Sequence, residues 1–247
     1  MKAIRDDNLK TLKGRTKIQY IWDYYKFPLT ILGILLYITA YILYGHISAK
    51  NSVLYVALVN VNAGEILTEG LSRDFLNYMN LDSSKNKIEL YSGLYLTDDE
   101  LNENIQYAYA SRIKILAMID GELLDVVLMN QEAFDAFSQN GYLYDLEELL
   151  PQMDSNLYDT ITPDLATNIV ILDDNQEELM FDTSASYYAV TEEHYYGIDL
   201  SRTSLIGSAG FAEPVYLGII ANSPRMDNAV NYLKYLYNYE SLERDIP

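Results

Sequence analysis

The feature that most constrains this chain is a long stretch without any charged side chain, from Phe27 to Ala49. A helix of this length can cross the hydrocarbon core of a bilayer. Its polar side chains, such as Thr30 and Thr39, form no polar stripe of the kind that a helix on a globular core shows. The stretch therefore predicts a transmembrane helix over 27–49, with a buried globular helix as the alternative.

A cleaved signal peptide is the other alternative for this stretch. The apolar region of a signal peptide is shorter and ends in a small-x-small cleavage site. Residues 45–49, Gly-His-Ile-Ser-Ala, make a poor site of that kind. We therefore expect an uncleaved signal anchor.

Charge is divided unevenly on the two sides of the span. Residues 1–26 hold seven basic and three acidic side chains, a sum of +4, whereas the remainder holds 17 − 7 = 10 basic and 36 − 3 = 33 acidic ones, or −23. Basic residues beside a span favour the cytoplasmic side. This predicts a cytoplasmic segment 1–26, a transmembrane helix 27–49 and an extracellular domain 50–247. The net charge of −19 opposes binding of phosphate backbones, so nucleic acid is not an expected partner.

Aromatic rings and a lysine stand immediately before the span. They are Tyr20, Trp22, Tyr24, Tyr25 and Lys26. Half-apolar rings favour the headgroup layer of a membrane. We expect these residues to anchor the helix at the membrane interface in contact with lipid, with a docking site for another membrane subunit as the alternative.

Strands and helices alternate along the rest of the chain. Apolar, β-branched runs predict strands at 52–61, 87–91, 124–129 and 216–221. Apolar spacing and capping signals predict helices at 66–79, 97–119, 131–139 and from 224 onward, with Thr97, Asn130 and Ser223 as N-caps. The polar run 173–176 predicts a hairpin turn between strands at 168–172 and 179–181. The alternation predicts an α/β fold with mostly parallel βαβ pairing.

Two passages of this domain carry a family resemblance. The first, 124–150, contains Leu-Asp-Val-Val-Leu-Met-Asn, then two phenylalanines and Gly-Tyr-Leu-Tyr-Asp-Leu; the second is 216–223, Tyr-Leu-Gly-Ile-Ile-Ala-Asn-Ser, with its following helix. They resemble extracellular solute-binding proteins of the type 2 periplasmic-binding class. The resemblance implies a lobe whose Asp-Val-Val strand delivers a residue to a ligand cleft. It is a reduced form, because only 151–210 remain for a second lobe.

The segment before the span adds a second likeness. Its run Tyr-Ile-Trp-Asp-Tyr-Tyr-Lys is similar to one in short membrane-anchored proteins of low-GC Gram-positive bacteria. That likeness implies a membrane anchor and says nothing about activity.

Polar side chains follow the first three predicted strands. In open sheets, ligands bind outside the carboxyl ends of parallel strands. The residues expected there are Asn60, Asn62, Tyr91, Asn130 and Gln131. Amide groups both donate and accept hydrogen bonds, as recognition of a small polar solute requires. The alternative is that the asparagines only cap helices and turns.

Residue types limit the chemistry available to the chain. With no Cys and only His46 and His194, we expect no metal site and no cofactor. Glu192-Glu193-His194 lacks the second histidine of a zinc-binding HExxH helix, and no serine stands in a nucleophile elbow. Of the classes compared, an enzyme is the least supported.

These features together predict a membrane-anchored extracellular binding protein. We expect an accessory or interaction subunit of a transporter-type membrane complex, with a permease as partner. The alternatives are a solute receptor feeding an ABC transporter and a surface enzyme. The acidic exterior suits a surface held close to anionic lipid and wall polymers, and recruitment of a cationic ligand or partner is the alternative.

Overall fold

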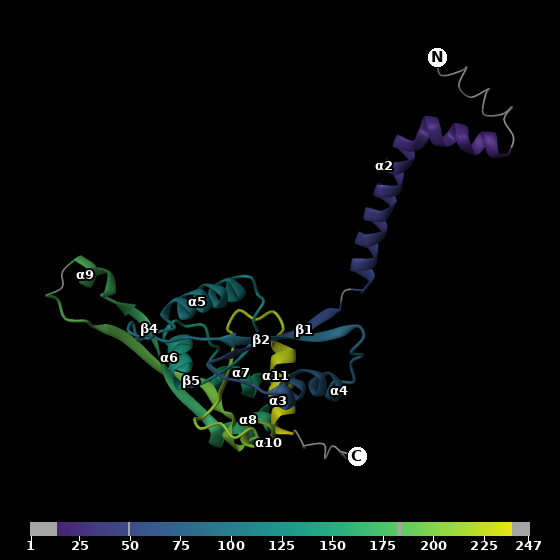
Figure 1. The fold of residues 1–247 in the computed structure, drawn as a ribbon. Helices are drawn as coiled ribbons and strands as arrows, with labels where there is room; N and C mark the ends of the chain where they lie inside the picture. The colour runs from purple at the N-terminus through teal and green to yellow at the C-terminus, as the bar shows by residue number, and fades with distance from the viewer. Residues whose placement is uncertain (1–13, 49, 182–183, 239–247) are drawn as a thin grey trace. The chain divides into compact units, whose positions relative to one another are not determined.

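The computed structural model describes residues 14–48, 50–181 and 184–238, and it divides into two compact units, Met1–Ala49 and Lys50–Pro247. The first unit contains helix α2 (Arg15–Ser48), which runs on through Pro28 (Figure 1). Its segment Tyr25–Leu43 is long and apolar enough to cross a membrane, and none of that segment is buried. A core helix of a globular protein would be mostly buried, so the exposed segment agrees better with a membrane span or a signal sequence.

The predicted interface residues precede or begin this segment. Trp22 is 67% exposed, and the Lys26 Nζ lies 5.8 Å from the centroid of the Phe27 ring. Tyr20 and Tyr24 belong to α2, but their side chains lie outside the described part of the structure. Residues 1–13 of the predicted cytoplasmic segment lie outside it as well.

The second unit, which we call the sheet domain, is built on one six-stranded sheet with the order β2-β1-β3-β6-β5-β4 (Figure 1). The strands are β1 (Asn51–Val59), β2 (Asn86–Leu94), β3 (Val126–Met129), β4 (Leu165–Asp174), β5 (Ala189–Asp199) and β6 (Tyr216–Ile219). β1 pairs in parallel with β2 and β3. The pairings β3–β6, β6–β5 and β5–β4 are antiparallel.

The prediction of an α/β fold is confirmed, whereas the prediction of mostly parallel pairing is wrong. The parallel half consists of the three strands that crossover helices connect. The other half is antiparallel because β4 and β5 follow one another in a hairpin, which needs no crossover. The sheet is therefore mixed.

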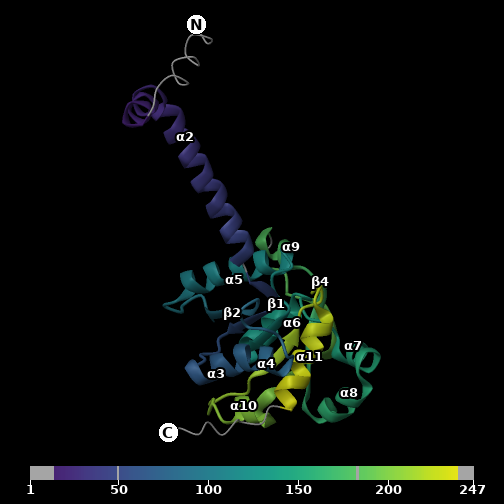
Figure 2. The ribbon, with the colours of Figure 1, turned by 90° about the vertical axis from the view of Figure 1, so that its right-hand side faces the viewer.

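Helices cover both faces of the sheet (Figure 2). The helices packed on one face are α3 (Glu65–Glu69), α4 (Phe75–Tyr78), α7 (Leu146–Met153), α8 (Ser155–Ile161), α10 (Ser204–Gly207) and α11 (Met226–Tyr237). Those on the other are α5 (Ile105–Asp120) and α6 (Gln131–Gln139). Alternate residues of β3 enter the two cores: Val126 and Leu128 face the first, Val127 and Met129 the second.

The helix predicted over 66–79 is confirmed, with a π-helical turn inside it. α3, the π turn Gly70–Asp74 and α4 follow without a break. A Cβ atom at Gly70 would lie 2.7 Å from the Leu205 Cδ1, so the glycine lets α10 pack closely on this helix. Asn130 caps α6 as predicted, because its side chain accepts a hydrogen bond from the Ala133 N–H.

Two predicted helix starts are wrong. α5 begins at Ile105 after Asn104, not at Thr97, whose hydroxyl accepts a bond from the Asp99 N–H in a local turn. α11 begins at Met226 rather than after Ser223. In both places, a hydroxyl accepts a hydrogen bond from a backbone N–H two residues later, and no helix begins there. Serine and threonine can form such local bonds in place of the backbone hydrogen bonds of a helix.

The predicted hairpin is also corrected. Leu179–Phe181 lie in helix α9 (Gln176–Phe181), and β4 pairs instead with β5. Since β4 and β5 join the same sheet as β1, the described residues of 151–210 form no second sheet facing the first. Solute capture by closure of two such lobes therefore has no structural counterpart in the described part of the chain.

Candidate functional site

A pocket of about 790 Å³ lies at the carboxyl ends of β1, β2 and β3, where the sequence predicts a ligand site. We call it the carboxyl-end pocket. It brings together Asn60, Asn62 and Asn130, and also Glu132, two residues after Asn130, and Tyr107, which sequence reasoning missed. Tyr107 belongs to α5 (Ile105–Asp120), so no signal next to a strand end reveals it. Amide, phenol and carboxylate groups line the pocket, but the Tyr107 hydroxyl already donates to the Gly93 carbonyl and the Glu132 Oε1 accepts from the Asp98 N–H at 3.2 Å.

The Asn60 side chain is held in place by three hydrogen bonds. Its Nδ2 donates to the Leu96 carbonyl at 2.8 Å and to the Asn130 Oδ1 at 3.1 Å, and its Oδ1 accepts from the Leu96 N–H at 2.8 Å. Its φ of 58° lies in the left-handed region, which asparagine adopts more readily than most residues. These bonds tie the loop after β1 to the segment after β2, so Asn60 shapes the pocket wall.

We expect Asn60→Ala to destabilise the sheet domain more than Asn60→Gly does. Both variants lose the three hydrogen bonds, but only alanine is strained at a φ of 58°. The difference in the free energy of unfolding should be about 1 kcal/mol in favour of glycine. Urea unfolding of the full chain in mild detergent, followed by pulse proteolysis, measures it. An alanine variant as stable as the glycine variant would show that the loop relaxes at this position.

The other two predicted ligand residues lie outside this pocket lining. The Gln131 Nε2 donates to the Asp135 Oδ1 at 2.7 Å along α6. The Tyr91 ring stacks on Tyr55 with 6.4 Å between centroids, and the Lys114 Nζ lies 5.4 Å from its centroid. The structure thus groups the three asparagines and separates them from Tyr91 and Gln131.

The outer parts of β4 and β5, together with α9, extend away from the body of the sheet domain (Figure 1). We call this segment, residues 168–194, the arm; 182–183 within it are not described. β5 pairs with β6 only at Ile198 and Asp199, so the arm lies beyond the six-stranded part of the sheet. Large apolar side chains are exposed along it, namely Leu172, Met180, Phe181, Tyr187, Tyr188 and Val190. Phe181 is 92% exposed.

Local hydrogen bonds shape the tip of the arm. The Asn175 side chain is buried, donates to the Ser186 carbonyl at 3.0 Å and accepts from the Tyr188 N–H at 2.9 Å. The Asp174 Oδ1 accepts from the N–H of Gln176, the first residue of α9, at 3.0 Å. The exposed apolar side chains therefore stand on a backbone that these hydrogen bonds hold in place.

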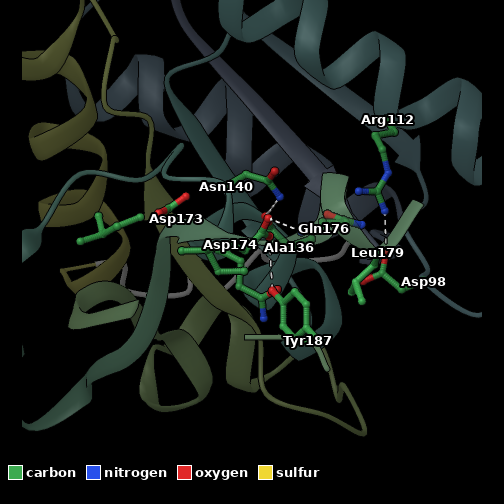
Figure 3. Close-up of a pocket in the computed structure, with 12 residues that line it drawn as sticks. Asp98, Arg112, Ala136, Asn140, Asp173, Asp174, Gln176, Leu179 and Tyr187 are labelled. Carbon is green, nitrogen blue, oxygen red and sulfur yellow. Dashed lines mark hydrogen bonds and ion pairs between the residues drawn. The ribbon is translucent and has the colours of Figure 1, made fainter. Parts of the chain in front are cut away.

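A second pocket, of about 810 Å³, lies between the arm and the end of α6 (Figure 3). We call it the arm pocket. Asp98, Asp173 and Asp174 line it with Ile171, Leu172 and Leu179. Its lining cation, Arg112, forms an ion pair of 2.7 Å with Asp98, and the Tyr187 hydroxyl lies 3.3 Å from the Asp174 Oδ2. The pocket combines acidic and apolar walls.

A histidine–carboxylate pair joins the root of the arm to α7. The His194 Nδ1 lies 2.8 Å from the Asp145 Oδ2, and its Nε2 lies 3.4 Å from the Glu192 Oε2. Asp145 also caps α7 by accepting from the Glu147 N–H. Burial lowers the pKa of His194, but the bonds to Asp145 and Glu192 outweigh it, so the pKa lies above the ordinary value of 6.5.

This pair predicts a pH-dependent stability. A raised histidine pKa means that the folded state favours the proton, so the stabilisation is complete below about pH 6.5 and is lost as pH rises through the folded pKa. We therefore expect His194→Gln to lower the unfolding midpoint more at pH 5.5 than at pH 8.5. Thermal unfolding at both pH values tests this, with Glu192→Gln as a variant that retains the Asp145 contact. An equal loss at both values would contradict a charged pair.

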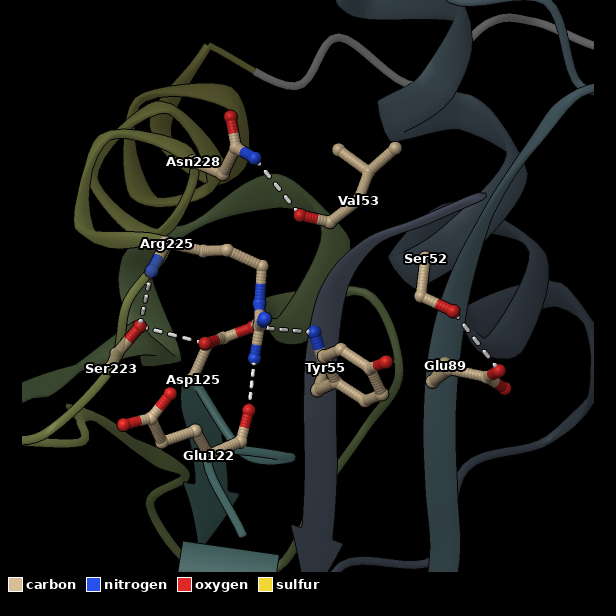
Figure 4. Close-up of polar contacts among 9 residues, drawn as sticks. All are labelled: Ser52, Val53, Tyr55, Glu89, Glu122, Asp125, Ser223, Arg225 and Asn228. Carbon is tan, nitrogen blue, oxygen red and sulfur yellow. Dashed lines mark hydrogen bonds and ion pairs between the residues drawn. The ribbon is translucent and has the colours of Figure 1, made fainter. Parts of the chain in front are cut away.

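A buried carboxylate organises the opposite end of the parallel strands (Figure 4). Asp125 is fully buried just before β3, and its oxygens accept from the Tyr55 N–H, the Ser223 hydroxyl and the Arg225 Nε, at 2.7–2.8 Å. Arg225 also donates to the Glu122 carbonyl and lies 4.4 Å from the centroid of the Tyr55 ring. The network therefore ties β1 and the start of β3 to the segment before α11.

The aspartate of the Asp-Val-Val run is part of this network and does not line the carboxyl-end pocket. Asp125 lies at the amino end of β3, whereas Asn130 and the carboxyl-end pocket lie at its carboxyl end. The pairing with Arg225 was missed by sequence reasoning. The signal available was a lone acid inside the otherwise apolar run Leu123–Met129, since buried charges need partners.

No family model, curated protein or solved structure matches the chain. The likeness of 124–150 and 216–223 to solute-binding proteins therefore stays a prediction. Within the described residues, no group of three or more His, Asp or Glu side chains is arranged to hold a metal ion.

Proposed function

We propose that this chain is a single-pass membrane protein with a cytoplasmic N-terminus and an extracellular sheet domain. It serves as an accessory or interaction subunit of a transporter-type membrane complex, by binding rather than by catalysis. The apolar segment of α2 supports the anchor. The basic excess of residues 1–26, +4 against −23 for the remainder, supports the orientation.

The observation that carries the interaction role is the arm. It exposes Met180 at 80% and Phe181 at 92%, together with further large apolar side chains on both of its strands. Exposed apolar surface of this kind marks contact sites in soluble domains, because leaving it in water is unfavourable. The hydrogen-bonded backbone of the arm holds this apolar surface away from the core, where a partner protein can reach it.

The carboxyl-end pocket favours a second candidate, a solute receptor for an ABC transporter. It has the size of a small-ligand site and carries convergent polar groups. Among the described residues no second sheet faces it, so a solute there would stay open to solvent on one side. We rank this candidate below the interaction subunit for that reason.

Isolation from membranes in mild detergent tests the interaction role. A tagged full-length chain should co-elute with a membrane protein in a fixed ratio. Met180→Ser combined with Phe181→Ser should reduce that recovery severalfold, because the exposed contact surface is lost. Ile66→Ser with Leu101→Ser is the matched control, since both residues are exposed apolar side chains outside the arm. A chain that elutes alone, or an equal loss in both variants, would refute the proposal.

A further inference from the structure

The charged side chains of the arm are acidic, apart from His194. Residues 168–194 contain seven Asp and Glu residues and no Lys or Arg. Along the described part of the arm, Lys and Arg form no ion pair with the six acids Asp173, Asp174, Glu177, Glu178, Glu192 and Glu193. The same segment carries the exposed apolar side chains, so acidic and apolar groups share one surface.

The charge determines which occupant this surface accepts. A second copy of the chain would bring another acidic arm, and like charges in contact repel. Anionic lipid headgroups are repelled in the same way. Glu192 has His194 as a partner, whereas the other described arm acids form no ion pair with any described residue. A cationic partner gains from these acids both in attraction and in rate of encounter.

The apolar groups determine the size of the occupant. Ile171, Leu172 and Leu179 line the arm pocket beside Asp173 and Asp174 and can receive one apolar or cationic side chain. Met180 and Phe181 lie outside that lining. A small amine in the pocket would leave them exposed, whereas a peptide segment covers the pocket and the tip together.

We propose that the arm and the arm pocket bind a protein segment in which Lys or Arg residues are interspersed with apolar residues. This proposal rests on the interaction role proposed above and names the chemistry of the partner. Apolar side chains of the segment cover Met180 and Phe181. Its cations face the arm acids, and one side chain enters the arm pocket.

A defined peptide tests the proposal without knowledge of the natural partner. The full chain is placed in phosphatidylcholine nanodiscs and titrated with a fluorescein-labelled decapeptide of alternating Lys and Leu, with empty nanodiscs as the blank. Glu177→Gln with Glu178→Gln should weaken binding about tenfold, and so should raising the ionic strength from about 0.05 to 0.5 M. Glu147→Gln with Glu148→Gln, the same charge change on exposed residues of α7, should change affinity less than about twofold.

Three outcomes overturn the proposal. They are equal binding by both charge variants, equal binding of a Glu-Leu decapeptide, and failure of Met180→Ser with Phe181→Ser to weaken the Lys-Leu peptide. Circular dichroism confirms that each variant is folded. If the membrane complex forms but is insensitive to salt and to Glu177→Gln with Glu178→Gln, the cationic-segment proposal fails while the interaction role stands. If no complex forms, the interaction role itself fails.

Discussion

Replacing Asp125 by alanine is expected to lower the free energy of unfolding of the sheet domain by about 3–5 kcal/mol. The carboxylate is fully buried and accepts hydrogen bonds from Tyr55, Ser223 and Arg225. Its removal leaves the Arg225 guanidinium, whose side chain is 24% exposed, without its anion. It also leaves the Tyr55 backbone N–H without the acceptor that the Asp125 carboxylate provides. An unpaired buried donor costs free energy.

Ser223→Ala is the matched control for this effect. It removes the Ser223 hydrogen bond to the same carboxylate and the one that the Ser223 Oγ accepts from the Arg225 N–H, and it leaves the ion pair intact, so the expected loss is about 1.5–3 kcal/mol. Urea-dependent pulse proteolysis of the full chain in mild detergent measures both variants. If Asp125→Ala cost no more than Ser223→Ala, the ion pair with Arg225 would contribute nothing to stability.

Protease added to intact cells is expected to remove the sheet domain completely. The proposed orientation places every residue after Ala49 outside, while the basic segment before the span stays inside. A C-terminal tag should disappear on treatment with proteinase K, and an N-terminal tag should persist at full intensity. In permeabilised cells both tags should be lost. Survival of the C-terminal tag on intact cells would reverse the proposed topology.

Much of the local structure was predictable because its signals lie within a few residues. Apart from Asp125, the run 124–129 is apolar on both faces, and the structure buries the whole of β3 between two helical layers. Asn130 caps α6, and Phe134 and Phe137 are buried, as their spacing predicts. Where local signals compete, prediction fails. Thr97 accepts a hydrogen bond within a turn, and α5 begins eight residues later, at Ile105.

The candidate sites were predictable only in part. The loops after parallel strands locate the carboxyl-end pocket, because βαβ pairing brings those loops to one edge. The side chains turned out to have separate tasks: Asn60 holds the loop, Asn130 caps a helix and Gln131 bonds to Asp135. Which atoms of a polar side chain are already bonded depends on neighbours that only the folded chain supplies.

By itself, the sequence determined the apolar segment, the division of charge around it, the α/β class and the positions of the buried strands, since each depends on composition or on periodicity within one element. Tertiary structure alone decided the antiparallel placement of β6 between β3 and β5 and the extension of the arm. It also decided the pairing of Asp125 with Arg225, which stand 100 positions apart, and of His194 with Asp145. Such contacts join segments whose local patterns are independent of one another, and they form because the burial of both sheet faces requires these segments to meet.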